Sequence, residues 1–328
     1  MILVTGGTGL VGGHLLFYLV KQGEKVRATY RHAEKVETVK TNLFLNHEDL
    51  FDNIEWVKAD ILDLPSLTHA FKNINIVYHC AAFISFVPHD YKKLRCANIE
   101  ATANVVNLCI ENKIDKLCYV SSIAAIGKPL VKEIITEETQ WNAEAENNVY
   151  AITKYGAEIE VWRATQEGVN AVIVNPGIIL GHGKWDSPSL SIFKKVKKGI
   201  SFYPAGGTGF VDVEDVVKAM VKLTESDIKN ERFIVIAENL SYKEVLHKIA
   251  EELKVKPPEK RVKKWQLEFL WRLDRFMGLL PGYKRKLTRI SARSLNTRDF
   301  YSNDKIKKEL NFVFKPVDET IKKACGKM

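Results

Sequence analysis

The first thirteen residues constrain the fold more than any other stretch of the chain. Residues 2–4 form a short aliphatic run typical of a buried strand, and a cluster of glycines follows at once. The apolar run 15–20 then predicts a helix that a further glycine closes. Gly7, Gly9 and Gly12 satisfy the spacing Gly-x-Gly-x-x-Gly between this strand and this helix, which is the context that a dinucleotide-binding turn requires.

Glycine at this turn has a specific physical use. Without a Cβ the backbone turns tightly and approaches a pyrophosphate closely, while the helix that follows directs free N–H groups and its positive dipole end at the phosphates. A turn with a purely structural role is the alternative. The candidate phosphate-binding residues are Gly6, Thr8, Gly9, Leu10, Val11 and Gly12.

The rest of the first half alternates strands with helices. Strands are predicted over residues 25–31, 54–59, 74–79 and 116–120, and helices over residues 98–112 and 150–165. Strands separated by helices pair in parallel through right-handed crossovers. The sequence therefore predicts an α/β fold, a doubly wound parallel Rossmann sheet.

Composition narrows the class of protein. The chain has 328 residues, of which 46% are hydrophobic and 27% charged, as in ordinary globular proteins. No apolar run reaches the roughly 18 residues that a membrane span needs, and a first strand at residue 2 leaves no room for a signal peptide, so we expect a cytoplasmic protein. The five cysteines include no CxxC pair, which favours reduced thiols over disulfides or a metal site.

The end of the second predicted strand bears on the choice of cofactor. Dinucleotide-binding folds that prefer NAD carry an acidic residue there for the ribose 2′-hydroxyl. This chain has no acid between Arg27 and Ala33 and carries Arg31 instead. A guanidinium suits a 2′-phosphate, which favours NADP(H). If Arg31 only stacks on adenine, NAD(H) stays possible.

Tyr150 and Lys154 carry the second chemical signal. Residues four apart lie on one face of a helix, so the Lys154 ammonium is predicted beside the Tyr150 phenol. A neighbouring cation lowers the pKa of a phenol, which makes it a general acid or base near neutral pH. The same spacing recurs at Tyr301 and Lys305 outside any strand–turn context, so the spacing alone is a weak signal.

The motifs together are more specific than any one of them. The glycine turn, the Asp60-Ile61 strand end, residues 79–82, Val120-Ser121-Ser122 and Tyr150-x-x-x-Lys154 occur in one order. This order resembles the extended short-chain dehydrogenase/reductase family, also called the NAD-dependent epimerase/dehydratase family, over about residues 1–217. Residues 26–31 look most like the branch of dihydroflavonol reductases and 3β-hydroxysteroid dehydrogenases.

The resemblance implies roles for matching residues. Tyr150 would donate and accept the proton, Lys154 would hold the nicotinamide ribose and lower the pKa of Tyr150, and Ser122 would bind the substrate oxygen, with Ser121 as the alternative. Further cofactor contacts would come from Asp60, Ile61, Ala81, Ala82, Pro176, Gly177, Ile178 and Ile179. The chain departs from the family at Ala101, where glycine is expected, so a relay role for Asn98 is not carried over. His79 is expected to be a core histidine, and no metal site is predicted.

The resemblance also implies a division of the chain. Residues 1–180 would form the NAD(P)-binding Rossmann domain, to which residues 210–240 return. Residues 181–209 and 241–328 would form a smaller C-terminal substrate lobe, with the cleft between the two. Phe83 and Phe86 follow a strand end and could face an apolar substrate.

Residues 264–280 are unusual. Large apolar residues repeat there at helical spacing, at Trp265, Phe269, Leu273, Phe276 and Leu280. We expect a helix packed on the core of the lobe; a wall of the substrate pocket and a weak membrane-surface contact are the alternatives.

Charge is concentrated around the same region. Residues 251–300 hold 14 Lys and Arg against 6 Asp and Glu, a net charge of 14 − 6 = +8. We expect a solvated basic face, with attraction of anionic substrates, phosphates or a membrane surface as the alternative, and no nucleic-acid partner. The resemblance allows a homodimer.

The predicted activity is that of an NADP(H)-dependent oxidoreductase. It would transfer a hydride between nicotinamide and the carbonyl or hydroxyl carbon of an apolar small molecule, such as a ketone, an aldehyde or a hydroxysteroid- or flavonol-like compound. The first alternative is a nucleotide-sugar epimerase or dehydratase with tightly bound NAD. The second is a non-catalytic NAD(P)-binding sensor.

Overall fold

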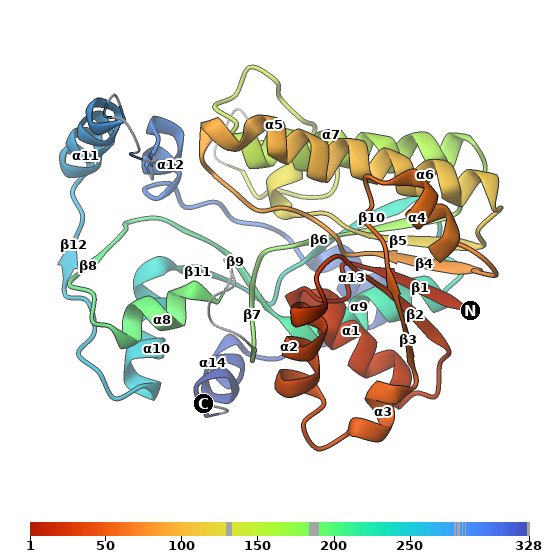
Figure 1. Cartoon of the computed structure of the whole chain (residues 1–328). Coiled ribbons are helices and arrows are strands. Elements are labelled where there is room, and N and C mark those ends of the chain that lie inside the picture. The colour runs from red at the N-terminus through yellow and green to blue at the C-terminus, as the bar shows by residue number, and fades with distance from the viewer. Residues whose placement is uncertain are drawn as a thin grey trace.

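A parallel sheet of seven strands forms the centre of the molecule (Figure 1). The structure is a computed structural model and describes residues 1–128, 133–183, 190–278, 280, 283, 285 and 287–326. The strand order is β10-β6-β5-β4-β1-β2-β3, and every neighbouring pair is parallel. The strands are β1 (Ile2–Thr5), β2 (Val26–Tyr30), β3 (Ile54–Lys58), β4 (Ile76–His79), β5 (Lys116–Val120), β6 (Ala171–Pro176) and β10 (Glu231–Val235).

Helices cover both faces of this sheet, which confirms the predicted doubly wound α/β fold. One face carries α1 (Leu10–Lys21), α2 (Ala33–Leu43), α3 (Glu48–Asp52), α9 (Val213–Glu225) and α13 (Asp304–Leu310). The other carries α4 (Leu64–Ala70), α6 (Ala101–Glu111) and α7 (Val149–Gln166).

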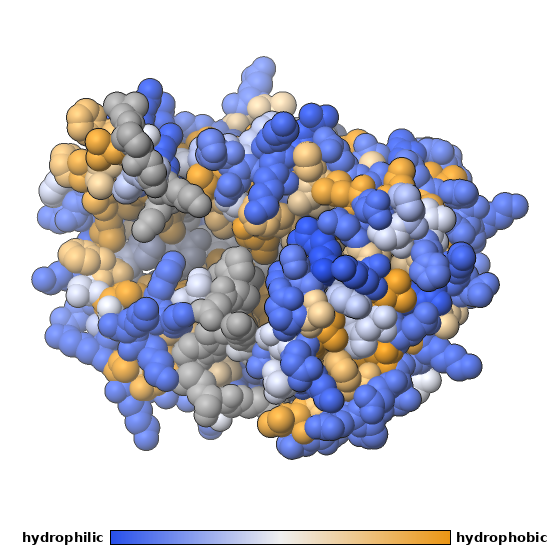
Figure 2. Space-filling view, viewed as in Figure 1, coloured by the Kyte–Doolittle hydropathy of each residue, from blue (hydrophilic) through white to orange (hydrophobic). Residues whose placement is uncertain are grey.

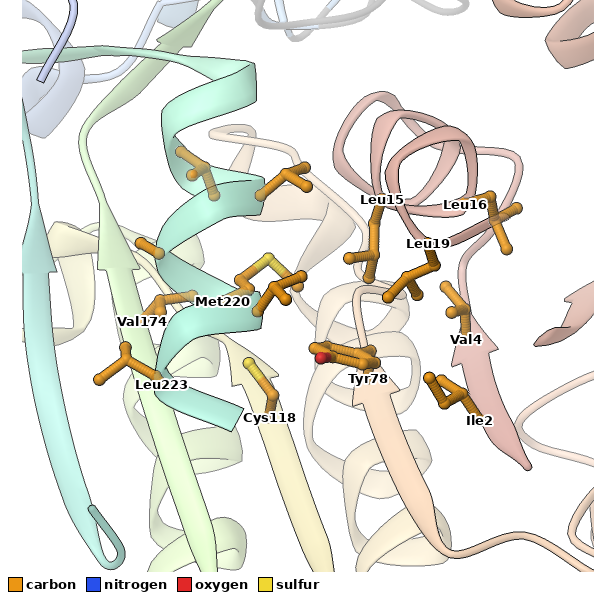
Figure 3. Packing of buried hydrophobic residues seen from close by; sticks show 14 of the residues in the cluster. Ile2, Val4, Leu15, Leu16, Leu19, Tyr78, Cys118, Val174, Met220 and Leu223 are labelled. Atoms are coloured by element: carbon orange, nitrogen blue, oxygen red, sulfur yellow. The ribbon is translucent and has the colours of Figure 1, made fainter. Parts of the chain in front are cut away.

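Alternation along the strands explains the two layers. In β1, Ile2 and Val4 pack with Leu15 and Leu16 of α1, as Figure 3 shows, while Leu3 belongs to the cluster on the opposite face. Successive side chains of a strand point to opposite faces, so three aliphatic residues in a row place apolar groups on both faces of the sheet, where both helical layers bury them. The short aliphatic run at the start of the chain therefore becomes a central strand.

A third apolar cluster lies beyond the carboxyl ends of the central strands (Figure 1). It joins Phe193 of α8, Phe210 of β9, Ile249 of α10 and Ile321 of α14. The elements on this side are β7 (Ile178–Leu180), α8 (Ser191–Lys197), β8 (Phe202–Tyr203), β9 (Gly207–Asp212), β11 (Glu238–Ser241), α10 (Tyr242–Glu252), β12 (Lys260–Arg261), α11 (Lys264–Met277), α12 (Arg289–Ser294) and α14 (Val317–Gly326). Strands β11, β9 and β7 form a three-stranded sheet, and β12 pairs with β8.

The division into two domains stays a prediction, but two observations bear on it. Strand β10 lies at the edge of the central sheet. Ile306 of α13 belongs to the apolar cluster between the central sheet and α1, although residues 241–328 were expected in the lobe. Residues 184–189 of the predicted lobe lie outside the described residues.

Several element boundaries differ from the predicted ones. The helix predicted over 98–112 is preceded by α5 (Tyr91–Leu94) and a π-helical turn, η2 (Arg95–Glu100), before α6 begins. Short 3₁₀ turns, η1 (Pro88–Asp90) and η3 (Ile123–Ala125), follow β4 and β5. Among the described helices, none combines the length and apolar composition that a membrane span requires.

The predicted packing of residues 264–280 is wrong. The helix α11 forms, but Leu267 and Trp271 are its packed apolar residues, against Ala292 of α12. The apolar residues that were expected to pack on the core of the lobe are exposed to solvent instead. They are Trp265, Phe269, Leu273, Phe276 and Leu280. Helical spacing identifies a stripe on a helix but not the side that its neighbours cover. Residue 279 lies outside the described residues.

Candidate active site

The glycine turn packs so tightly that two of its positions exclude any side chain. Gly6 has a φ of +70°, and a Cβ there would lie 2.6 Å from the backbone N of Ala81. A Cβ on Gly12 would lie 2.2 Å from the carbonyl oxygen of Gly6. The turn is closed by a hydrogen bond of 2.9 Å from the Gly9 N–H to the same oxygen.

The start of α1 fits the pyrophosphate of a dinucleotide. Gly9 precedes the helix, no side chain caps its first N–H groups, and the first turn carries no acidic residue. Free N–H groups and the positive end of the helix dipole are the features that bind phosphate. Strands β1 and β4 are neighbours at this point, and the chain leaves them toward opposite sides of the sheet. Such a switch point is where open α/β sheets bind ligands.

Arg31 and Asp60 lie at the carboxyl ends of β2 and β3, the two strands beyond β1 on one side of the central sheet. Arg31 follows β2 and Asp60 follows β3, and the Nη1 of Arg31 lies 3.8 Å from the Oδ2 of Asp60. Both side chains are exposed. Their neighbouring strands bring together two residues that were predicted at the adenosine end of the cofactor, together with the half-buried Ile61.

The remaining predicted cofactor residues gather at the carboxyl ends of the neighbouring strands. Ala81 and Ala82 follow β4, Pro176 ends β6, and Ile178 and Ile179 begin β7. Gly177 lies between β6 and β7, and a Cβ on it would lie 2.3 Å from the carbonyl oxygen of Gly209 in β9. Because parallel strands end at one edge of a sheet, these residues line one rim.

Tyr150 lies in the first turn of α7, buried beside the loop that follows β5. Asn148 caps this helix, since its Oδ1 accepts a hydrogen bond of 2.8 Å from the N–H of Ala151. Burial raises the pKa of the Tyr150 phenol to about 12, and a hydrogen bond with Ser122 acts in the opposite direction. The expectation of a lowered phenol pKa is wrong for the chain by itself, because desolvation favours the neutral phenol.

Lys154 lies one turn further along α7, and its ammonium is turned to β5. Its Nζ donates to the Oη of Tyr119 at 2.7 Å and to the carbonyl oxygen of Val120 at 2.8 Å. Burial lowers the pKa of Lys154 to about 7, although the Glu158 carboxylate favours the charged form. Because burial shifts the pKa of Lys154 downward, this side chain is a weaker source of positive charge for the Tyr150 phenol than an exposed lysine would be.

A buried polar network beside Lys154 includes His79. The Thr5 hydroxyl lies 2.6 Å from Nδ1 of His79, and the Thr102 hydroxyl lies 3.0 Å from Nε2. Burial lowers the pKa of His79 to about 3, so the imidazole is neutral and both nitrogens are paired. The expected core histidine is confirmed.

The structure distinguishes the two candidate serines. The Ser121 hydroxyl donates to the Oε2 of Glu158 at 2.6 Å, in the interior. Ser122, at the turn, accepts a hydrogen bond of 3.1 Å from the N–H of Ala124 and contacts Tyr150. Ser122 is therefore the serine on the side of the phenol.

Glu158 is the residue that sequence reasoning missed. It is buried, and its carboxylate also accepts hydrogen bonds from Asn175 at 2.9 Å and from Arg232 at 3.1 Å. The Asn175 amide donates in addition to the carbonyl oxygen of Ser122 at 3.0 Å. Continuing the four-residue spacing beyond Lys154 would have found Glu158 on the same helix face.

Asn98 is occupied in fixing the loop after β4. Its Oδ1 accepts from the Phe83 N–H at 2.8 Å, and its amide donates to the Phe83 carbonyl at 3.0 Å and to the Thr153 hydroxyl at 3.1 Å. This side chain positions the backbone of Phe83. The Phe83 ring itself lies under the ammonium of Lys93, 4.3 Å from its centroid.

A pocket of about 300 Å³ opens next to Tyr150. Phe86 connects the two, because its ring meets that of Tyr150 edge-on at 5.5 Å. The described residues that line the pocket come from the loop after β4, the start of α7 and the start of α12: Phe86, Pro88, Glu146, Asn148, Val149, Thr288, Arg289 and Ile290. The contribution of α12 was not foreseen. Within the described part of the chain, no cluster of three or more His, Cys, Asp and Glu could hold a metal ion.

Comparisons with known proteins agree with this geometry. A Synechocystis sp. protein named "Putative dihydroflavonol 4-reductase" is 28% identical over 323 residues, covering 94% of this chain and 88% of that protein. Anthocyanidin reductase of Arabidopsis thaliana is 28% identical over 270 residues, covering 74% and 77% of the two chains.

Solved structures match over nearly the whole chain. The crystal structure of gox2253 has a TM-score of 0.82 at 26% identity and covers 99% of this chain and 97% of that one. The Bordetella bronchiseptica enzyme WbmH, solved in complex with NAD+, has a TM-score of 0.74 at 18% identity, covers 99% and 97%, and shows a shared fold. The model of the NAD dependent epimerase/dehydratase family matches residues 2–237, most of the length of the chain. The chain therefore belongs to the NAD dependent epimerase/dehydratase family and is an NAD(P)-dependent enzyme of the extended short-chain dehydrogenase/reductase type.

Proposed function

We propose that this enzyme is an NADP(H)-dependent reductase of an apolar carbonyl compound, working reversibly as a dehydrogenase of the alcohol. The observation that carries the proposal is the pocket beside Tyr150, whose walls include Phe86, Pro88, Val149 and Ile290. The other described lining residues, Glu146, Asn148, Thr288 and Arg289, are polar, and a pocket that combines apolar walls with a few polar groups binds apolar molecules in a fixed orientation. The relatives named as reductases support the same reaction class.

The chain's own residues would act on the substrate oxygen. Ser122 and Tyr150 would hydrogen-bond that oxygen, and the Tyr150 Oη would transfer the proton. Burial raises the pKa of the Tyr150 phenol to about 12, so the phenol carries a proton at neutral pH that it would donate in the reductive direction. Lys154 would bind the ribose hydroxyls from its place one helical turn away. The bound cofactor supplies the hydride, and the protein orients and tunes it.

Arg31 supports the preference for NADP(H). It is exposed, and its contact with Asp60 is a loose pair at 3.8 Å between two solvated groups, so it is a weak competitor for a 2′-phosphate. A doubly charged phosphate offers the guanidinium a bidentate, charge-assisted contact. NADPH would then bind more tightly than NADH.

The reaction is tested by following the absorbance of NADPH and NADH in the presence of a panel of apolar ketones and aldehydes. Tyr150→Phe should abolish turnover while the cofactor still binds. Tyr155→Phe is the matched control, because Tyr155 lies on the same helix but stacks on Trp141, whereas Tyr150 contacts Ser122 and the Phe86 ring. Turnover of the Tyr150→Phe variant at the wild-type rate would contradict the assignment.

The cofactor preference has a separate test. Arg31→Gln should raise the KM for NADPH roughly tenfold or more, the loss of one charge-assisted phosphate contact, and leave the KM for NADH within about twofold. Arg95→Gln removes an exposed arginine elsewhere and serves as the control. An unchanged KM for NADPH would refute the role of Arg31. Interconversion of nucleotide sugars without net oxidation of NADPH or NADH would identify the enzyme as an epimerase.

A further inference from the structure

Helix α11 carries apolar residues on two opposite sides. Leu267 and Trp271 pack against Ala292 of α12 in a small cluster. On the other side the side chains of Trp265 and Phe276 are 64% and 71% exposed. With 100° between successive residues, the second set lies roughly opposite the first.

The large exposed apolar residues of α11, together with Leu280 just beyond its end, form a row that we call the aromatic stripe. Its members are Trp265, Phe269, Leu270, Leu273, Phe276 and Leu280. Single exposed apolar residues need no explanation, but a contiguous row of large ones marks a surface that contacts a partner or a membrane. Figure 2 shows hydrophobic side chains gathered in the part of the molecule where Figure 1 places α11.

Positive charge surrounds the aromatic stripe. Six exposed cations lie on α11 and on the segment that leads into it: Lys260, Arg261, Lys263, Lys264, Arg272 and Arg275. The two acidic residues of the helix are both engaged. Glu268 accepts hydrogen bonds from Trp271 at 2.9 Å and Arg272 at 2.8 Å, and the buried Asp274 accepts one from Tyr283 at 2.8 Å.

The helix also adjoins the candidate substrate pocket. It packs on α12, and Thr288, Arg289 and Ile290 at the start of α12 line the pocket. A surface that held α11 would therefore lie near the pocket, and an apolar substrate dissolved in that surface would reach it with little exposure to water.

We propose that α11 docks this enzyme on the surface of an anionic lipid bilayer, with the aromatic stripe in the interface and the surrounding lysines and arginines among the headgroups. A helix with aromatic and aliphatic residues on one side and basic residues around them lies in the plane of a membrane interface. The charge argues against a second copy of the chain as the occupant, because two copies would bring the same cations together. Acidic headgroups are complementary to those cations.

The test is sedimentation of the full chain with vesicles. Wild-type protein should sediment with vesicles of phosphatidylcholine and phosphatidylglycerol and bind more weakly to phosphatidylcholine alone or in high salt. The double variant Phe269→Glu/Phe276→Glu should lose roughly tenfold or more in its partition coefficient. Val313→Glu is the matched control, because Val313 is 85% exposed elsewhere on the molecule and should leave binding unchanged.

Two further measurements keep the proposal falsifiable. Lys263→Gln/Lys264→Gln should weaken binding to anionic vesicles and leave binding to neutral ones unchanged. Circular dichroism of each variant verifies the fold. Failure of the wild-type protein to sediment, or equal sedimentation of the Phe269→Glu/Phe276→Glu variant, would overturn the proposal. A vesicle-independent dimer that this variant converts to a monomer would assign the aromatic stripe to a second copy instead.

Discussion

Glu158→Gln removes a buried charge without changing the shape of the side chain. The Glu158 carboxylate accepts hydrogen bonds from Ser121, Asn175 and Arg232, and it is almost completely excluded from water. An amide in its place keeps one acceptor and gains an N–H that must face groups which are themselves donors. The charge that compensates Arg232 is lost as well.

The cost follows from the surroundings of Arg232. Removing one partner of a buried ion pair costs about 3–5 kcal/mol when the other charge is left uncompensated. Arg232 keeps a hydrogen bond of 2.8 Å to the Glu137 carbonyl, and its side chain is 19% exposed. We therefore expect the lower end of that range, about 3 kcal/mol less free energy of unfolding.

Urea denaturation of the wild-type protein and of the variants Glu158→Gln and Glu160→Gln measures the change in the free energy of unfolding. Glu160 lies on the same helix but pairs with Arg163 near the surface at 3.0 Å, so its substitution should cost about 0.5 kcal/mol or less. Arg232→Gln and the double variant complete a thermodynamic cycle that isolates the coupling of Glu158 with Arg232. A cost for Glu158→Gln no larger than that for Glu160→Gln would refute the reasoning.

Three further outcomes are expected. Gly12→Ala places a Cβ 2.2 Å from the Gly6 carbonyl oxygen, so it should destabilise the fold by about 2 kcal/mol or more and weaken cofactor binding, which denaturation and fluorescence titration with NADPH would measure. Burial lowers the pKa of Lys154 to about 7, so between about pH 7 and 10.5 the folded chain binds fewer protons at this residue than the unfolded chain. The free energy of unfolding should therefore rise with pH across this window. Lys154→Met should flatten that rise in thermal melts recorded over the same pH range. Burial alone would raise the pKa of Glu214, but ion pairs such as that with Lys315 outweigh burial and lower the pKa to about 2. The stabilisation that these ion pairs give the folded state is therefore complete above pH 4.5 and lost as the pH falls toward 2. In acid unfolding curves Glu214→Gln should lower the free energy of unfolding by about 1–2 kcal/mol at pH 7 and by little at pH 2.

The sequence predicted those parts of the site that depend on local geometry. Glycines at fixed spacing after a strand can form only a few turns, and Gly6 and Gly12 take up the close approaches that the motif implies. Tyr150 and Lys154 lie on one helix because the four-residue spacing is a property of helices. The capping box of Ser241 and Glu244 at the start of α10 is a local device of the same kind, because its two hydrogen bonds join residues three apart.

Other properties depend on what packs against a residue. Lys154 could as well have faced Tyr150, but the fold supplies Tyr119 and Val120 as the hydrogen-bond partners of its ammonium. Burial of Tyr150 then raises the pKa of its phenol, where a facing cation would have lowered it. The pocket wall from α12 joins the site from more than a hundred residues further along the chain.

The amino-acid sequence by itself determined the parallel sheet, the glycine turn and the helix that carries Tyr150, because strand alternation, glycine conformation and helical period are local properties. Only the tertiary structure decided the direction of the pKa shift of Tyr150, the role of Glu158 and the side of α11 that meets solvent. Each of these depends on desolvation and on partners brought from distant segments, and neither quantity is encoded in the spacing of neighbouring residues.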